Sequence, residues 1–470
     1  MSELPLLHRA SHRRRRRRRR PNCLQLIVWL AVFALAFLLT LLVVYQDDFM
    51  DYSSRRPVAA STANMQQQQQ EIISLERVGA TERDQVWLKS RRLLANQTSP
   101  LGMWLLSEAD GTRPLPPARN PNNGDKPFLI VVWKQGEFLE RRHIRRFSDK
   151  FHSPWENCPV DNCELSYRDE DVDKADAVLF HLQRLEGRAS LPTERRHPRQ
   201  RWVFLTDESP LHTFPSSRGS AANIAEYDGL FNWSMSYRLS SDVPVPYGRT
   251  RLDRSGRLDE ATVSAPGAKS KLVAILGSNC AASERWEYVR ELQSLLRPDE
   301  LDVLGRCNGA NRTACPGHFE TDCPALGRYK FYLAFENSRC REYLSEKTWW
   351  HGFAKGAVPV VMGPARSELE PILPPDSFMH VDDFAGPSSL VDYMRYLSSQ
   401  PGEIERRFHA WRKRGYRVLQ EHGYFGAPSR HYCRLCHALN FNDPRPKVYL
   451  NMRKLGANDC AASPPILKHN

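Results

Sequence analysis

The stretch Tyr329-Lys-Phe-Tyr-Leu-Ala-Phe-Glu-Asn-Ser-Arg-Cys-Arg-Glu-Tyr-Leu-Ser-Glu-Lys347 joins an apolar run to a polar turn and then to a second ordered segment. The apolar run, 330–335, predicts a buried strand, because successive apolar side chains can fill both faces of a sheet. Polar residues follow directly after Phe335, at the carboxyl end of this strand, where open α/β sheets bind ligands. These polar residues are Glu336, Asn337 and Ser338.

The second ordered segment begins after Tyr343 and predicts a helix that starts near Ser345. A helix N-terminus carries free N–H groups and a partial positive charge, which suit a phosphate, and Lys347 adds a full charge. The same residues also fit a purely local role, in which Ser345 caps the helix and Glu346 compensates its dipole. Physical chemistry alone leaves both interpretations open.

Apolar runs alternate with charged segments on both sides of this stretch, which predicts parallel sheets in an α/β fold. Further strands are expected at 128–133, 175–181, 201–205, 271–276 and 358–362, and helices at 284–296, 345–355, 390–399 and 403–420. The polar segment 249–270 resembles an interdomain linker. We therefore predict two Rossmann-like domains that face a cleft, at 126–250 and 270–440, followed by a C-terminal tail at 441–470.

The N-terminal region predicts a single membrane anchor. Residues 24–45 carry no charge, and a helix of this length spans about 33 Å, enough to cross a bilayer. Nine Arg precede it in residues 1–23, so the positive-inside rule predicts a cytoplasmic tail and a type II orientation. Because much of the net charge of +13 lies in this tail, nucleic acid is not expected as a partner. The polar, Pro-rich segment 46–125 predicts a luminal stem, with a possible helix at 71–94.

The cysteines and the N-glycosylation sequons support a location outside the cytosol for the part of the chain that follows the anchor. Ten cysteines follow the anchor, an even number that suits disulfides, although their spacing does not give the pairing. Cys433 and Cys436, within His431-Tyr-Cys-Arg-Leu-Cys-His437, fit a disulfide role better than a zinc site, because no distant second pair exists. Cys158 and Cys163 are further disulfide candidates. The N-glycosylation sequons are Asn96, Asn232 and Asn311.

The quoted stretch resembles the donor-binding motif of the α-1,3/4-fucosyltransferases of glycosyltransferase family 10. The segments Gly356-Ala-Val-Pro-Val-Val-Met-Gly-Pro364 and Asp376-Ser-Phe-Met-His-Val-Asp-Asp-Phe384 are similar to that family too. The resemblance extends from about residue 126 to Cys436. It implies a GT-B-like fold, GDP-β-L-fucose as donor and inversion to an α-linkage. Ser278-Asn-Cys280 and the early Cys158 to Cys163 segment look closer to invertebrate and core-type members.

The resemblance also implies roles for individual residues. Lys347 and Arg285 would bind the GDP diphosphate, and Glu346 would contact the sugar portion of the donor. Without the resemblance, Arg285 fits an exposed charge on an amphipathic helix. Two cations can stabilise departing GDP without a metal, so no cofactor is expected and Asp382-Asp383 is not expected to hold an ion. The other expected donor contacts are Ser278, Asn279, Asn337, Tyr343, Tyr237 and Arg238.

The base that takes the proton from the acceptor hydroxyl is expected from the first half. Trp202-Val-Phe-Leu-Thr-Asp-Glu-Ser-Pro-Leu-His-Thr213 places two acids just beyond a strand, and the family's Glu-Ser-Pro-x-His segment implies Glu208, with Asp207 left open. His212 is expected to be structural. These features predict a Golgi α-1,3-fucosyltransferase that acts on N-acetylglucosamine of glycoprotein glycans. The alternatives are a member that modifies protein or an unusual acceptor, and a catalytically silent luminal binding protein.

Overall fold

The computed structural model describes residues 81–107, 126–213, 224–253, 269–281, 283–308, 315, 322–455 and 459–460. All of them belong to one compact unit, Thr81–Asn470. The expected cytoplasmic tail, the expected anchor at 24–45 and the sequon at Asn311 lie outside the described residues. Among the helices that are described, none combines the length and the apolar character needed to span a membrane.

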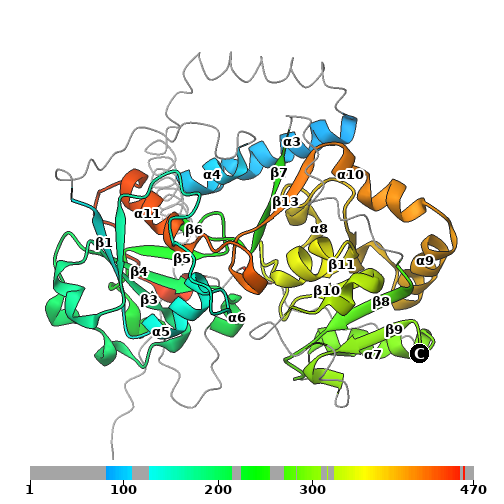
Figure 1. Ribbon diagram of the computed structural model, residues 1–470, viewed down its shortest axis with the longest axis horizontal. Coiled ribbons are helices and arrows are strands. Elements are labelled where there is room, and N and C mark those ends of the chain that lie inside the picture. The colour runs from blue at the N-terminus through cyan, green and yellow to red at the C-terminus, as the bar shows by residue number, and fades with distance from the viewer. Residues whose placement is uncertain are drawn as a thin grey trace, which may run out of the picture. The chain divides into compact units, whose positions relative to one another are not determined.

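The first half is built on a parallel sheet of six strands (Figure 1). Its order is β2-β1-β3-β4-β5-β6, and the strands are β1 (Phe128–Val132), β2 (Cys163–Ser166), β3 (Ala177–His181), β4 (Arg201–Thr206), β5 (Trp233–Ser236) and β6 (Val243–Pro244). Strands β3 and β4 are apolar along most of their length because both faces of the sheet are covered. The strands predicted at 128–133, 175–181 and 201–205 are confirmed.

The second half contains a five-stranded parallel sheet of order β12-β11-β10-β8-β9. Its strands are β8 (Lys271–Leu276), β9 (Leu301–Leu304), β10 (Tyr329–Phe335), β11 (Val358–Met362) and β12 (Met379–His380). The helices α7 (Glu284–Leu295) and α9 (Pro387–Ser399) pack into the core of this sheet. The predicted α/β fold with two parallel sheets is therefore confirmed. The strand predicted at 330–335 is confirmed as well and is part of β10.

A two-stranded ribbon replaces part of the expected linker and part of an expected helix. Strand β7 (Gly248–Leu252) pairs antiparallel with β13 (Tyr416–Gln420). The helix predicted at 403–420 is therefore wrong beyond α10 (Ala410–Lys413). Gly415 explains the break: its φ is 91°, and a Cβ there would lie 2.5 Å from the carbonyl oxygen of Asp253.

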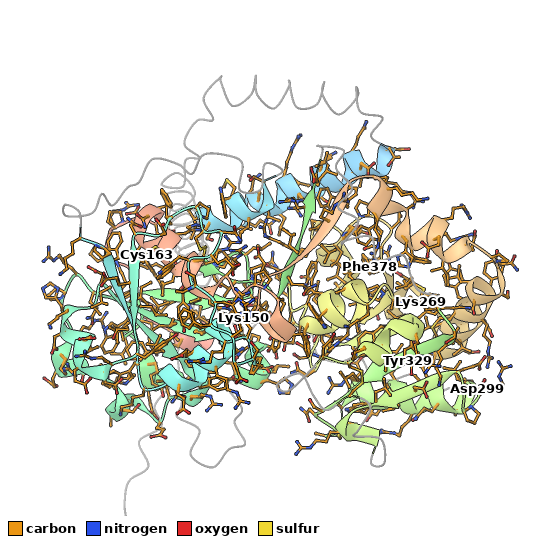
Figure 2. All side chains as sticks on the ribbon, viewed as in Figure 1. Lys150, Cys163, Lys269, Asp299, Tyr329 and Phe378 are labelled. Carbon is orange, nitrogen blue, oxygen red and sulfur yellow. A yellow bond between two sulfur atoms is a disulfide. The ribbon has the colours of Figure 1, made fainter. Side chains whose placement is uncertain are left out.

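The C-terminal part of the chain returns to the first half, which corrects the boundary expected at 440. Helix α11 (His431–Phe441) packs in the core of the first sheet through residues that include Leu435 and Leu439. Disulfides Cys158–Cys433 and Cys163–Cys436 fasten it there, and Figure 2 places Cys163 in this half. Residues 441–455 of the expected tail also belong to the folded body, because Met452 is buried in the core on the other face of the same sheet.

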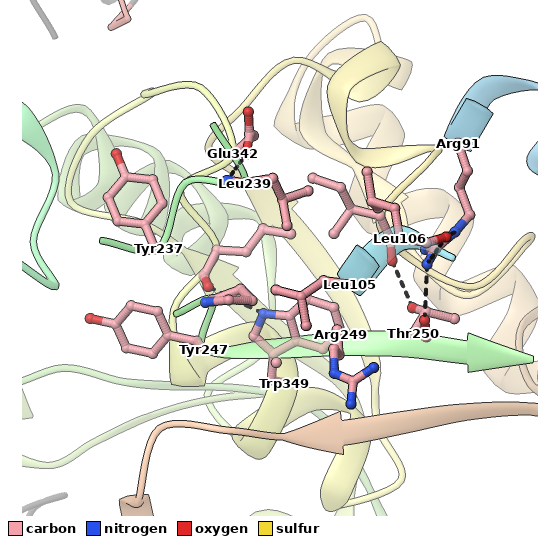
Figure 3. Close-up of a pocket in the computed structure, with 14 residues that line it drawn as sticks. Arg91, Leu105, Leu106, Tyr237, Leu239, Tyr247, Arg249, Thr250, Glu342 and Trp349 are labelled. Atoms are coloured by element: carbon pink, nitrogen blue, oxygen red, sulfur yellow. Dashed lines mark hydrogen bonds between the residues drawn. The ribbon is translucent and has the colours of Figure 1, made fainter. Parts of the chain in front are cut away.

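Residues 81–107 belong to the folded body and not to a stem. Helix α3 (Glu82–Ala95) confirms the helix expected at 71–94 over the residues that are described there, and α4 (Pro100–Leu106) follows it. The indole of Trp87 donates to the carbonyl of Leu373, 2.8 Å away. The guanidinium of Arg91 donates to carbonyls of α4, the second half and β7, namely those of Leu106, Pro371 and Thr250. Figure 3 shows Arg91 at the pocket that these segments line together.

The two described sequons differ in exposure. Asn96 is exposed at the C-cap of α3, where a glycan could be attached. Asn232 is 5% exposed, its amide donates to the carbonyl of Lys447, and its oxygen accepts from the backbone N–H of Trp202. A glycosylated Asn232 would lose these bonds and its place in the core.

Candidate active site

Residues beyond the ends of β4 and β10 meet between the two halves. Glu208 follows β4, and Asn337 follows β10 in the quoted stretch. One carboxylate oxygen of Glu208, Oε2, accepts from Asn337 Nδ2 at 3.1 Å and from the Tyr343 hydroxyl at 3.0 Å. An acid of the first half is thus held by two neutral donors of the second half.

Its neighbour Asp207 points in another direction, into the interior of the first half. The Asp207 carboxylate lies 2.8 Å from the Arg142 guanidinium, and 3.3 and 3.2 Å from the imidazoles of His422 and His431. Burial alone would raise the pKa of Asp207, but these neighbours outweigh it and hold that pKa well below its usual range. Between the two acids that the sequence leaves open, Glu208 is the one that faces the second half.

The loop that carries Glu208 is fixed at several points. Tyr247 donates its hydroxyl to the Asp207 carbonyl at 2.9 Å, and the Thr213 hydroxyl donates to the Glu208 carbonyl at 3.1 Å. His212 lies 3.3 Å from the carbonyl oxygen of Asn337. This His212 contact joins the loop to the second half through the backbone, which agrees with the structural role expected for that residue.

Lys347 lies in a cluster of acids and hydroxyls at the end of β10. Its ammonium is 3.0 Å from Glu336 Oε2 and 3.6 Å from Glu346 Oε1. Burial would lower the pKa of Lys347, but the two carboxylates outweigh burial and raise it. The Ser345 hydroxyl donates to Glu336 at 2.8 and 2.9 Å. The interpretation of Ser345 as only a helix cap is therefore insufficient, because its hydroxyl helps to hold the acid that holds Lys347.

Arg285 is a buried cation at the ends of two strands of the second sheet. It is 6% exposed, so the exposed-charge interpretation is wrong. Its guanidinium donates to the carbonyls of Asn279 at 2.9 Å and Phe335 at 3.3 Å, and within the described residues no carboxylate approaches it within ion-pair distance. Burial lowers the pKa of Arg285, with Glu336 opposing the shift. A buried cation without a carboxylate partner has charge available to attract an anion.

Ser278 and Asn279 form an exposed turn at the end of β8. The carbonyl of Asn279 accepts from both Arg285 and the Trp286 indole, which ties the turn to α7. The disulfide Cys280–Cys307 joins the same turn to the segment after β9. These contacts place the expected donor residues Ser278, Asn279 and Arg285 at one edge of the second sheet.

Tyr237 and Arg238 lie on the first-half side of the site. The Tyr237 ring lies 5.0 Å from that of Tyr343, and Arg238 forms ion pairs with Glu342 and Asp459. Both residues line a pocket together with Glu208. The structure therefore places Arg238 next to Glu208 in the first half. Lys347 and Arg285 lie in the second half, near the carboxyl ends of its strands.

Comparison with known proteins matches both halves. Residues 125–248 match the family described as fucosyltransferase, N-terminal, and residues 266–455 match glycosyltransferase family 10 (fucosyltransferase) C-term. The chain is 38% identical over 351 residues to Alpha-(1,3)-fucosyltransferase 7 of Rattus norvegicus, covering 74% of this chain and 82% of that protein. This chain belongs to the fucosyltransferases of glycosyltransferase family 10.

A second mammalian relative of this fucosyltransferase also matches. Alpha-(1,3)-fucosyltransferase 4 of Homo sapiens is 40% identical over 286 residues, which cover 60% of this chain and 50% of that protein. A crystal structure of α1,3-fucosyltransferase with GDP-fucose aligns at a TM-score of 0.40 and 15% identity, over 74% of this chain and 98% of that one. The expected enzyme class is confirmed, whereas the expected likeness to invertebrate and core-type members gains no support from these relatives.

The fucosyltransferase has one group of described residues with metal-ligand spacing: His143, Asp207 and His431. Arg142 already neutralises Asp207, so a divalent ion there would add buried charge without an anion to balance it. Among the other candidates, Asp382 pairs with Arg339. The zinc alternative at 431–437 is wrong, because Cys433 and Cys436 belong to separate disulfides.

The sequence does not indicate the residues that hold other site residues in position. Sequence reasoning named Glu336 as polar beyond the strand but gave it no role, although Glu336 contacts both Ser345 and Lys347. It did not connect Asp207 with Arg142 or His422, which lie 65 and 215 positions away. A polar residue next to an expected ligand residue was the available signal for Glu336, and no local signal indicated the Asp207 contacts.

Proposed function

We propose that this fucosyltransferase transfers L-fucose from GDP-β-L-fucose to N-acetylglucosamine of glycoprotein glycans, with inversion and in α-1,3 linkage. The names of the mammalian relatives support the linkage. The observation that carries the proposal is the contact of Glu208 with Asn337 and Tyr343. Through this contact, a carboxylate of the first half lies against the part of the second half that carries Arg285 and Lys347.

Glu208 acts as the general base in this proposal. As the acceptor hydroxyl oxygen bonds to the anomeric carbon of fucose, the carboxylate takes its proton and the bond from that carbon to the GDP oxygen breaks. Asn337 and Tyr343 both donate to Oε2, so they orient the carboxylate, while Oε1, which has no hydrogen-bond partner among the described residues, accepts the proton. The Glu208 carboxylate lies on the side of the anomeric carbon opposite GDP. The acceptor oxygen therefore attacks from that side, and the configuration at the anomeric carbon is inverted.

Arg285 and Lys347 bind the diphosphate and stabilise the negative charge that develops on departing GDP. Arg285 supports this role because it is buried without a carboxylate partner among the described residues. Glu336 and Ser345 hold the Lys347 ammonium in place, and Glu346 lies beside it to contact the sugar portion of the donor. With two cations at the diphosphate, the reaction needs no resident metal.

We place the enzyme in the Golgi membrane as a single-pass type II protein, with residues 24–45 as its anchor. Five disulfides in the body support an oxidising lumen. Protease protection of the body in sealed vesicles tests this orientation, and digestion there would reverse it.

Transfer is tested with the full-length protein in detergent, GDP-fucose and three acceptors: a paucimannose N-glycan, N-acetyllactosamine and a GalNAc-containing disaccharide. Mass spectrometry shows which acceptor gains a deoxyhexose, and linkage analysis shows its position. Transfer to N-acetylglucosamine at position 3 is the expected result. Absence of transfer, donor hydrolysis and donor binding would favour the silent binding protein instead.

A further inference from the structure

A pocket opens beside Glu208 on the first-half side of the site. Most of its polar lining consists of neutral hydroxyls from the ends of β4 and β5, including Thr206, Ser234 and Ser236. Hydroxyls can both donate and accept hydrogen bonds, and so they match the hydroxyls of a sugar. Because Glu208 lies in the same lining, a sugar in this pocket would present its hydroxyl to the proposed base.

The remaining wall of this pocket is formed by Tyr449, Leu455 and Asp459, which we call together the C-terminal segment. The Tyr449 hydroxyl lies 2.9 Å from the Ser234 hydroxyl and donates to Asp242 at 2.7 Å, which fixes it beside β5. The ring of Tyr449 also packs edge-on against Phe204 of β4, with centroids 5.5 Å apart. Aromatic and apolar surface next to hydroxyls is the composition that sugar-binding pockets need, since a sugar ring has an apolar face as well as a polar edge.

Asp459 is held from two directions. Its carboxylate pairs with Arg238, and its carbonyl accepts from the backbone N–H of Arg341 at 2.6 Å. The next residue, Cys460, forms a disulfide with Cys340. Cys340 lies between Asn337 and Tyr343, the two residues that hold Glu208, so this disulfide fastens the C-terminal segment directly to the loop that orients the proposed base.

We propose that this pocket binds the acceptor sugar and that the C-terminal segment, fastened by Cys340–Cys460, is its specificity-determining wall. The inference rests on the proposed function, because the pocket needs Glu208 as base to act on the sugar. Arg238 is paired with both Asp459 and Glu342, so its charge is neutralised and the pocket suits a neutral sugar. In this arrangement Arg238 is an acceptor-side residue and not a contact of the donor.

The test uses full-length enzyme with both cysteines replaced, Cys340→Ser and Cys460→Ser, and N-acetyllactosamine as acceptor. The KM for N-acetyllactosamine should rise about tenfold, because the wall loses its covalent fastening, while the KM for GDP-fucose should stay within about twofold. The matched control is the Cys315→Ser and Cys323→Ser pair, which removes a different disulfide. It should leave the acceptor KM unchanged.

Asp459→Asn provides a second variant that keeps the disulfide. It weakens the bond to Arg238 and should raise the KM for N-acetyllactosamine about fivefold, again with little change for GDP-fucose. An unchanged acceptor KM in Asp459→Asn, or in a folded double Ser variant, would overturn the inference while leaving the proposed function intact. If the wild-type enzyme transfers fucose to no acceptor, the proposed function fails, and saturation-transfer NMR with N-acetyllactosamine then decides whether the pocket binds a sugar at all.

Discussion

The two halves of this fucosyltransferase build their shares of the site in different ways. In the second half, one continuous stretch supplies Asn337, Tyr343 and Lys347 from a strand end, a turn and a helix start. In the first half, Glu208 depends on residues far away in sequence: Asp207 beside it pairs with Arg142, His422 and His431. The second half gathers these residues through local geometry, whereas in the first half a buried charge network fixes Asp207, the neighbour of Glu208.

This difference has an energetic consequence. Removing Lys347 leaves Glu336 buried without its cation, although the backbone N–H and hydroxyl of Ser345 still donate to it. The loss should therefore appear in donor binding and, to a smaller extent, in stability. Removing Asp207 leaves the Arg142 cation inside the protein without its partner, so the loss should appear in folding. The comparison therefore predicts that donor-side substitutions change ligand affinity, whereas substitutions around the base change turnover or stability.

The largest effect is expected for Glu208→Gln. The amide keeps the shape of the side chain but cannot take a proton, so kcat should fall by about 10²- to 10⁴-fold. GDP-fucose affinity, measured by calorimetry, should stay within about threefold, because the residue contacts the donor side only through Asn337 and Tyr343. Glu194→Gln, at an exposed position of the same half, is the control. Loss of GDP-fucose binding in Glu208→Gln would refute the division of roles.

Replacement of Asp207 by Ala should cost about 3–5 kcal/mol of unfolding free energy, because it leaves Arg142 buried and unpaired. Urea denaturation followed by tryptophan fluorescence measures this loss. The matched control is Asp173→Ala, which breaks an exposed ion pair with Arg195 and should cost much less, because water screens that pair. Equal losses for the two variants would mean that the buried network contributes no more than a surface pair.

Lys347→Ala should weaken GDP-fucose binding by about 100-fold, which corresponds to one charge-assisted contact with a phosphate. The free energy of unfolding should fall as well, because the buried Glu336 loses its cation, but by less than in Asp207→Ala, since Ser345 still donates to Glu336. Lys355→Ala is the control. Lys355 directly follows the helical segment Lys347–Ala354, which begins with Lys347, and it pairs with Asp322. If the two lysine variants bind GDP-fucose equally well, Lys347 does not hold the diphosphate.

The same contrast explains what the sequence could predict. The strand at 329–335, its polar end and the helix start near Lys347 are neighbours in the chain, so periodicity and turn chemistry indicate them directly. The network around Asp207 and the return of α11 to the first sheet depend on contacts between distant segments: Asp207 and His431 are 224 positions apart, and Cys158 and Cys433 are 275 apart. The burial of Arg285 was missed for the same reason: an amphipathic helix does not reveal that carbonyls of two strand ends will receive a guanidinium.

The smallest expected effect concerns His431, whose pKa falls to about 4 because burial disfavours its charged form. The unfolded chain binds this proton near pH 6.5, whereas the folded protein binds it only near pH 4, so unfolding free energy should decrease as the pH falls between these values. His431→Gln keeps a donor to Asp207 and cannot titrate, so it should reduce that decrease by about 1–2 kcal/mol. Urea denaturation at several pH values measures both slopes, with the exposed His197→Gln as control. Identical slopes for His431→Gln and wild type would show that the imidazole next to Asp207 takes up its proton equally well in the folded and unfolded states.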